Sequence, residues 1–269
     1  MTAKTLFVSH QTQYHFDRPV SYALQRLKLR PKDNAGQTVL NWNIEIDGGH
    51  IECRSEDAHL NHVDLVSVAP GRSDITVTCS GTVSTTNDDG IIGRHRGLIP
   101  LWCFQRATAM TTAGKAIAKM LGGFQIDPAN ELGGLHALSD MVRGYLPYED
   151  GYTAANTTAE QAIGIGKGVC QDHAHIFLAA ARHLGIPARY VSGYLLMEGI
   201  TDQSASHAWV EAHVDSLGWV GFDVSNGYSP DQRYIRVATG FDYRDAAPIT
   251  GLSFGATDKS MVVSLRVEQ

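Results

Sequence analysis

Residues 168–194 constrain the fold more than any other part of the 269-residue sequence. Their apolar positions recur three and four residues apart, which is the pattern of a helix with one buried face. These positions are Ala174, Phe177, Leu178, Ala181 and Leu184. Gly185 then favours a helix C-terminus and Pro187 prevents continuation, so residues 189–196 are predicted to form a strand. The sequence thus predicts a buried helix that leads directly into a sheet.

Cys170 falls in the first turn of this helix, directly after a glycine-containing loop. The N–H groups of a first turn have no intrahelical partner and the helix dipole is positive there, so a thiolate is favoured over a thiol. The N–H of Cys170 is also free to donate to an oxyanion. The alternative is that Cys170 is a small buried apolar residue, an interpretation that is sufficient for Cys53, Cys79 and Cys103.

A thiolate nucleophile needs a base, and an imidazole base needs an acceptor that orients it. His207 begins an alternating segment over 207–214, and Asp223 lies at the end of an apolar segment over 219–224. With a turn at 215–218, the two segments predict a hairpin that brings His207 and Asp223 side by side. Taken singly, His207 is an ordinary solvated or core histidine, and Asp223 an ordinary strand-end or turn residue.

The remaining patterns divide the chain into two regions. Residues 1–105 carry period-2 or β-branched runs between turn residues, which predicts a small antiparallel β-sandwich-like domain. These runs are 5–8, 21–30, 39–46 and 75–83. Residues 106–269 are predicted to form a second domain, with helices over 107–121 and 130–146, one beginning near Thr158, and a final strand over 261–267. The predicted fold class is therefore α+β.

Three motifs resemble the transglutaminase-like superfamily over roughly residues 130–230. They are GVCQDHAHIFLAAARHLGIPARYVSGY, SHAWVEAHV and GWVGFDVSNG, and they occur in the family's order and spacing. The first hundred residues resemble the β-rich N-terminal region of bacterial members, notably around 14–17 and 26–31. The resemblance implies a papain-like core, in which the cysteine helix packs on a small antiparallel sheet that bears the histidine and the aspartate.

By this resemblance Cys170 is the nucleophile, His207 the base and acid, and Asp223 the residue that orients the imidazole. One departure is visible, because many relatives read Asp-Pro-Thr-Asn where this chain has Asp-Val-Ser-Asn at 223–226. The missing proline is expected to affect only local rigidity, and Asn226 is expected to help fix the loop.

The sequence does not select the other residues of the pocket as clearly as the triad. Some relatives use an aromatic side chain upstream of the cysteine as a second oxyanion donor. Tyr148 and Tyr152 are candidates, no spacing selects one of them, and both can equally be packing residues. Trp209 and Asn226 are further candidates for the pocket.

Four polar residues near the motifs receive plainer interpretations. Asp172 is interpreted as a first-turn acid that complements the helix dipole, with tuning of the nucleophile as the alternative. Glu211 is interpreted as a solvated residue, with a specificity role as the alternative. His173 and His183 are expected on the exposed or partly exposed side of the cysteine helix.

The resemblance implies cysteine-dependent acyl transfer or hydrolysis at amide bonds through a thioester. The expected substrate is a peptide or protein amide, with an amine as a further acceptor. Two alternatives remain: a cysteine peptidase or amidase, and a non-catalytic binding module with a relic triad. The first differs only in whether water or an amine resolves the thioester.

No metal or other cofactor is expected. Cys170, His173 and His175 are close in sequence, but positions 173 and 175 of a helix point about 200° apart. No second cysteine pair completes a zinc set, and no acidic loop has the spacing of calcium ligands.

Charge and hydropathy exclude further classes. The 22 Lys and Arg residues are scattered and outnumbered by 28 Asp and Glu, for a formal charge of −6, so no nucleic-acid partner is expected. No apolar run reaches the roughly 20 residues that cross a bilayer, and the first residues lack the apolar stretch of a signal peptide. We therefore expect a cytoplasmic protein without a membrane partner. The sequence predicts no oligomeric state.

Overall fold

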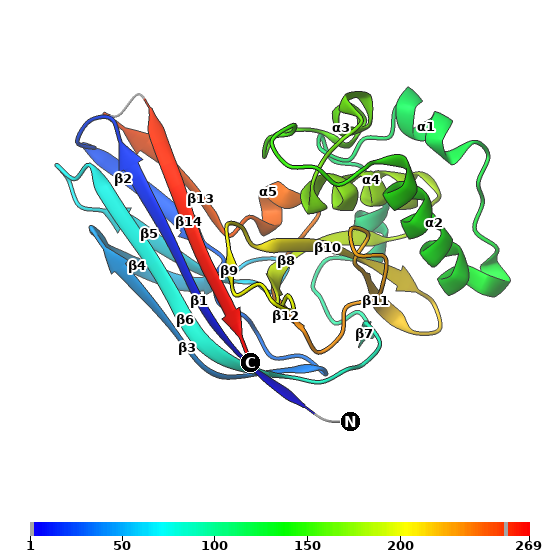
Figure 1. Cartoon of the computed structure of the whole chain (residues 1–269), viewed down its shortest axis with the longest axis horizontal. Coiled ribbons are helices and arrows are strands. Elements are labelled where there is room, and N and C mark those ends of the chain that lie inside the picture. Colours follow the sequence, from blue (N-terminus) through cyan, green and yellow to red (C-terminus); the bar gives the residue numbers. More distant parts are fainter. Residues whose placement is uncertain (1–2, 256–257) are drawn as a thin grey trace.

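Three antiparallel sheets and a group of helices make up the part of the chain that this computed structural model describes, residues 3–255 and 258–269. Two of the sheets pack face to face as a sandwich (Figure 1). The first contains, in spatial order, β3 (Gln37–Asp47), β6 (Asp74–Thr85), β1 (Lys4–Phe16), β14 (Lys259–Glu268) and β9 (Asp202–Gln203). The second contains β13 (Ile249–Phe254), β2 (Tyr22–Leu27), β5 (His62–Val68) and β4 (Gly49–Glu56).

The third sheet carries the helices, and we call this sheet with its helices the α/β layer (Figure 1). Its strands are, in spatial order, β12 (Tyr234–Gly240), β8 (Ala188–Leu195), β10 (His207–Val214), β11 (Gly218–Phe222) and β7 (Ile91–Gly93). Its helices are α1 (Lys115–Leu121), α2 (Glu131–Tyr145), α3 (Ala159–Ile165), α4 (Cys170–His183) and α5 (Tyr243–Ala246). Two short 3₁₀ helices are η1 (Leu101–Gln105) and η2 (Pro128–Asn130).

Helix α4 is the centre of the α/β layer. It packs across β10 and β8 and also contacts α2 and α3, so every residue over 172–182 is buried. The helix ends at His183, and Gly185 follows with a φ of +80°, a backbone conformation that glycine adopts without strain. The predicted helix, its C-terminus and the strand after it are therefore confirmed.

The sandwich and the α+β class are also confirmed, but one predicted helix is half wrong. The pattern over 107–121 predicted a helix, and α1 begins only at Lys115. The Thr111 hydroxyl accepts from the N–H of Thr108 and from the buried guanidinium of Arg182 (2.6 Å), which also binds the carbonyl of Phe104. Threonine hydroxyls in this segment bind groups that a helix would otherwise use. The contact with Arg182, which lies far along the chain, could not be predicted from the local periodicity.

The sheets do not divide the chain at residues 105 and 106. The predicted final strand exists as β14, but it pairs with β1 in the sandwich. Strand β13 likewise pairs with β2, so the chain returns to its first region at its end. Conversely, β7 from the first region pairs with β11 in the α/β layer. Each region therefore supplies strands to the other, which the predicted ranges 1–105 and 106–269 do not reflect.

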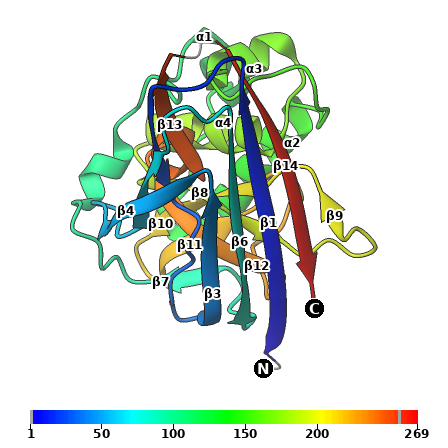
Figure 2. The same cartoon turned by 90° about the vertical axis from the view of Figure 1, so that its left-hand side faces the viewer.

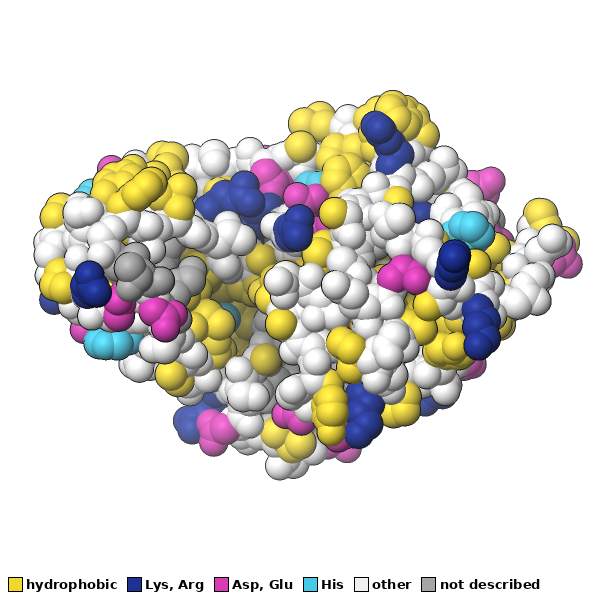
Figure 3. All heavy atoms as spheres, turned by 90° about the horizontal axis from the view of Figure 1, so that it is seen from above, with side chains coloured by type: hydrophobic (Ala, Val, Ile, Leu, Met, Phe, Trp, Pro, Cys, Tyr) yellow, Lys and Arg dark blue, Asp and Glu magenta, His cyan; other side chains and the backbone are white. Residues whose placement is uncertain are grey.

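Long strands join the two parts. Figure 2 shows β6, β1 and β14 running side by side along the molecule, with the helices behind them. Leu6 and Val8 of β1 share one apolar cluster with Tyr194 of β8 and with Ile235 and Val237 of β12. Seen from above in Figure 3, a hollow with hydrophobic side chains on its floor separates the sandwich from the α/β layer. No helix of the described residues combines the length and the apolar character that crossing a membrane requires.

Candidate active site

Cys170 is the first residue of α4, and the helix start leaves backbone donors unused. Val169 is the N-cap, and its carbonyl accepts from the N–H groups of Asp172 and His173. The N–H groups of Cys170 and Gln171 have no acceptor within the described residues. The Cys170 side chain is partly exposed, so this helix N-terminus offers a reachable thiol beside free donors.

The other three cysteines have different environments. Cys79 is buried in the sandwich, and burial raises the pKa of its thiol to about 12. Cys53 is exposed and Cys103 is partly exposed. In the described chain, neither of these two thiols has a histidine or carboxylate as hydrogen-bond partner.

His207 and Asp223 meet in a buried hydrogen bond. Nε2 of His207 donates to Oδ2 of Asp223 over 2.6 Å, and the two side chains are 7% and 0% exposed. His207 begins β10 opposite Gly193 of β8. A Cβ at Gly193 would meet the ring of Trp209 at 2.6 Å, so glycine there leaves room for Trp209 to stack beside His207.

Asp223 is held by several donors besides His207. The Tyr234 hydroxyl donates to Oδ2 over 2.6 Å, and the Asn226 amide donates to the same oxygen over 2.7 Å. The backbone N–H of Asn226 donates to Oδ1 over 3.2 Å. Burial raises the pKa of Asp223, but these hydrogen bonds and the charge of His207 outweigh burial and lower it. The carboxylate therefore stays ionised without contact with water.

His207 is correspondingly stabilised as an imidazolium. Burial lowers its pKa, but the hydrogen bonds to Asp223 and Cys170, and the charges of both groups, raise it to about 10. Because Nε2 is occupied by Asp223, Nδ1 is the ring nitrogen that remains for Cys170. Thiol, imidazole and carboxylate thus form one chain of interactions.

His173 and Glu211 are both buried, so the sequence predictions for them are wrong. His173 is 1% exposed; its Nε2 donates to the carbonyl of Leu146 (2.7 Å), and its Nδ1 accepts from the Ser225 hydroxyl (2.8 Å). It thereby fastens α4 to the loop that follows Asp223. Periodicity placed this residue on the outer side of α4, but the loop after β11 covers that side.

Glu211 was expected in solvent and is 0% exposed. It lies between Arg189 of β8 and Arg236 of β12, each 2.6 Å away. Burial raises its pKa, and the two guanidinium groups outweigh burial and lower it to about 2. Its partners come from β8, which pairs with β10, and from β12 on the far side of β8, so the sequence of β10 alone does not show them.

Asp172 binds the backbone at the start of α4. Its Oδ2 accepts from the Val169 N–H (2.8 Å) and from the Thr153 hydroxyl (2.6 Å). Burial raises its pKa. His183, at the other end of α4, is exposed as expected.

The candidate pocket residues lie in different places. Tyr148 lies beside the site: its backbone bridges Gly168, and burial followed by the charge of Cys170 raises its pKa to about 12. Tyr152 packs against Lys167, whose ammonium lies 4.4 Å from the centre of its ring. The backbone bridge to Gly168 places Tyr148 near the start of α4, whereas Tyr152 is paired with Lys167.

Trp209 and Asn226 support the site from behind. Asn226 binds Asp223 as described above, and Trp209 is 3% exposed and packs beside His207. Tyr234 was missed, because its strand β12 was not predicted; the β-branched residues of that segment, Ile235, Val237 and Thr239, were the available signal.

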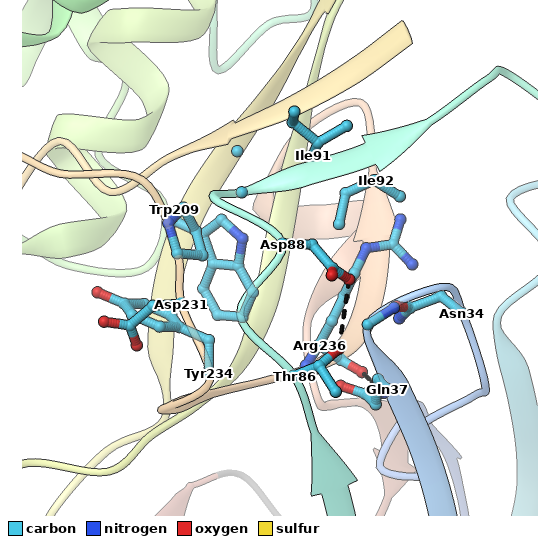
Figure 4. A pocket seen from close by; sticks show the side chains of 14 residues that line it. Asn34, Gln37, Thr86, Asp88, Ile91, Ile92, Trp209, Asp231, Tyr234 and Arg236 are labelled. Carbon is cyan, nitrogen blue, oxygen red and sulfur yellow. Dashed lines mark hydrogen bonds between the residues drawn. The ribbon is translucent and has the colours of Figure 1, made fainter. Parts of the chain in front are cut away.

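A small cavity lies next to these supporting rings (Figure 4). Trp209 and Tyr234 border it on one side, and Gln37 and Asp88 of the first region border it on the other. The first region therefore contributes to the packing around the rings that hold His207 and Asp223. Within the described residues, no group of three or more His, Cys, Asp or Glu side chains is arranged to hold a metal ion.

Comparison with known proteins gives consistent results. The family model described as "Transglutaminase-like superfamily" matches residues 123–224, and the one described as "Bacterial transglutaminase-like N-terminal region" matches residues 6–84. An uncharacterised protein of Mycobacterium leprae is 30% identical over 96% of this chain and 97% of its own length. An uncharacterised protein of Mycobacterium tuberculosis is 25% identical over 95% and 89%, respectively.

Among solved structures, a Cytophaga hutchinsonii protein described as a candidate cysteine protease superposes with a TM-score of 0.80. The match covers 100% of this chain and 91% of that chain at 20% identity, so it shows a shared fold. The family assignment therefore rests on the two family models, the full-length relatives and this shared fold, and not on the three motifs alone. The chain belongs to the transglutaminase-like superfamily.

Proposed function

We propose that the protein is an enzyme that cleaves an amide bond through a Cys170 thioester and passes the acyl group to an amine or to water. The observation that carries this proposal is the buried His207–Asp223 hydrogen bond beside a partly exposed thiol at a helix N-terminus. Family membership supports a cysteine-based enzyme in general terms.

In the first half-reaction the Cys170 thiolate attacks the carbonyl carbon of a carboxamide. A C–S bond forms, and the carbonyl electron pair moves to oxygen. The free N–H groups of Cys170 and Gln171 are available to donate to this oxyanion, and the Tyr148 hydroxyl is a candidate for another donor. The oxyanion then collapses, the C–N bond breaks, and the imidazolium of His207 gives its Nδ1 proton to the leaving amine.

In the second half-reaction neutral His207 acts as the base. It takes a proton from an attacking amine or water, the new C–N or C–O bond forms, and the Cys170 thiolate leaves. Asp223 keeps Nε2 protonated throughout, so that Nδ1 always exchanges the proton. A peptide or protein amide is the proposed acyl donor. The use of water alone would make the protein a peptidase or amidase.

Site-resolved alkylation tests the proposal. The rate of iodoacetamide modification is measured by peptide mass mapping across about pH 5–9, for wild type and His207→Ala. We expect Cys170 to react far faster than Cys53 and Cys103 at low pH, and to lose this advantage without His207. If Cys170 reacts no faster than the exposed Cys53, the triad is a relic and the binding-module alternative is favoured.

The two resolving reactions are separated by product analysis. With a glutamine- or amide-containing peptide, release of ammonia or amine accompanied by a new isopeptide or amide product identifies an acyl transferase. Release with only the free acid, even with an added primary amine, identifies a hydrolase. Cys170→Ala serves as the matched control and should release neither.

A further inference from the structure

A hollow of about 170 Å³ lies where the sandwich meets the α/β layer. Strands β1 and β14 form its sandwich side, with Thr12, Tyr14 and Val263 among the lining residues. Ser206 and Tyr243 line it on the side of the α/β layer. The two parts of the chain therefore build this hollow jointly.

The hollow lies next to the proposed triad. Ser206 directly precedes His207 in the chain. The ring centre of Tyr243 lies 6.1 Å from that of Tyr190, and Cys170 packs against the hydrophobic cluster that contains Tyr190. The hollow is thus flanked by one neighbour of the base and by one aromatic pair close to the nucleophile.

The lining offers no charge to a ligand. Among the described lining residues the only titratable groups are two tyrosines and His10. His10 is 3% exposed, and burial lowers its pKa to about 4, so it is neutral. Its ring nitrogens are engaged by the Tyr194 hydroxyl (2.9 Å) and the Thr12 hydroxyl (3.1 Å). A charged ligand group would lose its water here without a compensating partner.

A second hollow of about 260 Å³ adjoins the first, because Tyr14 and Ile249 line both. It follows the successive residues 249–253 of β13, and its described lining is also uncharged. Gln25 lines it, is 6% exposed, and its Oε1 accepts no hydrogen bond from the described residues. A buried acceptor without a partner is costly, so a rotation of the Gln25 side chain that brings this oxygen to an N–H donor of a ligand in the hollow would be favourable.

Strand β13 is also an edge of its sheet. It pairs with β2 on one side, and no described strand pairs with its other side. The backbone groups of such an edge can bind an extended peptide. The second hollow therefore combines an uncharged surface with two kinds of hydrogen-bonding group that match a peptide backbone.

We infer that the two adjoining hollows bind the non-reacting part of the acyl donor, and that this part is an uncharged, extended peptide segment with an apolar side chain near the reacting amide. The first hollow takes the apolar side chain, and the second takes the backbone that continues from it. The sandwich is then a substrate-binding wall of the site. This inference rests on the proposed function of Cys170.

Haloacetamide probes that differ in the group on the amide nitrogen test the inference without a known substrate. The probes are iodoacetamide, its N-benzyl and N-(2-phenylethyl) derivatives, and N-iodoacetylglycine, and each Cys170 rate is divided by the rate of the same probe with glutathione. We expect an aromatic probe to exceed iodoacetamide by about tenfold, the size of a modest apolar pocket contribution. N-iodoacetylglycine, which carries a carboxylate, should fall below iodoacetamide.

Two neighbouring valines give a matched pair of variants. Val263 lines the first hollow, whereas Val262 is its neighbour on β14 and is 63% exposed. Val263→Trp should abolish the aromatic advantage, measured relative to the iodoacetamide rate of the same variant, and Val262→Trp should retain this advantage. Thermal unfolding verifies that both variants fold. Val263→Ala, a milder change, should reduce the aromatic advantage by several-fold if the tryptophan variant does not fold.

The outcomes distinguish a failure of the inference from a failure of the proposed function on which it rests. A fast iodoacetamide reaction without any aromatic advantage in wild type overturns the inference and leaves the proposed function intact. An equal loss of aromatic advantage in Val262→Trp and Val263→Trp also overturns it. A Cys170 that is inert toward every probe overturns the proposed function and, with it, the inference.

Discussion

At the scale of single residues, one carboxylate organises the site. Asp223 accepts from His207, Tyr234 and twice from Asn226, and none of these bonds depends on water. The sequence motifs identified Asp223 and Asn226, since both lie directly after the hairpin that His207 begins. They did not identify Tyr234, because it comes from a strand eleven residues further along the chain.

The charge of Asp223 is expected to control the protonation of His207. Because Asp223 helps to raise the pKa of His207 to about 10, its replacement by the neutral amide in Asp223→Asn should lower that pKa. In wild type, the rate of Cys170 alkylation should stay nearly constant from about pH 6 to 9. In Asp223→Asn, this rate should fall as the pH is lowered. Turnover should fall by about 10⁴-fold, as when other triads lose this carboxylate. An unchanged pH profile in Asp223→Asn would contradict the assignment.

Tyr234→Phe makes a smaller change at the same carboxylate. It removes one donor and leaves His207 and Asn226 bound to Asp223. We expect the free energy of unfolding to fall by about 1–2 kcal/mol, since the lost bond is buried and charge-assisted. Turnover should fall by less than about tenfold. Urea unfolding and steady-state kinetics measure the two effects; a loss as large as that of Asp223→Asn would show that Tyr234 is more than a support.

At the scale of elements, the sequence predicted α4 and its hairpin well because their signals are local. A glycine and a proline end the helix, and alternation marks β10. Burial from other elements was not predictable in this way. His173 is covered by the loop after β11, and Glu211 of β10 is paired with arginines from β8 and β12. Both errors arise where tertiary packing replaces solvent.

The Glu211 ion cluster should make the fold acid-sensitive. Its pKa is lowered from the ordinary 4.5 to about 2, so the unfolded state binds more protons between these values. The stability contributed by the carboxylate is therefore full above about pH 4.5 and is lost as the pH falls toward 2, by an amount on the order of 3 kcal/mol. Urea unfolding at pH 7, 4 and 3 measures this loss.

Glu211→Gln isolates that contribution. The variant leaves the guanidinium groups of Arg189 and Arg236 buried without their anion, so it should be less stable at pH 7 by about 3–5 kcal/mol. Its stability should also decline less than that of wild type between pH 4.5 and 3. Glu198→Gln, at an exposed position, is the control and should match wild type. An acid dependence identical to that of wild type would exclude Glu211 as its source.

At the scale of the whole molecule, the two regions of the sequence are interleaved. The sequence composition changes near residue 105, and that change located the helical part of the chain, although α1 begins only at Lys115. It did not reveal the partner of the last strand, because β14 pairs with β1 across more than 240 residues of chain. The alternating pattern of a strand does not identify a pairing partner that lies so far away in the chain.

This interleaving predicts that residues 106–269 do not fold alone. The fragment would expose Tyr194, Ile235 and Val237, which share a cluster with Leu6 and Val8, and would leave β14 without β1. We expect it to be insoluble or to lack a cooperative urea transition, and we expect co-expression with residues 1–105 to restore both the transition and rapid Cys170 alkylation. The intact chain is the reference for both measurements. If the isolated fragment unfolds cooperatively and its Cys170 reacts as in the intact chain, the α/β layer is autonomous; the first region would then be an appended wall of the site and not part of its fold.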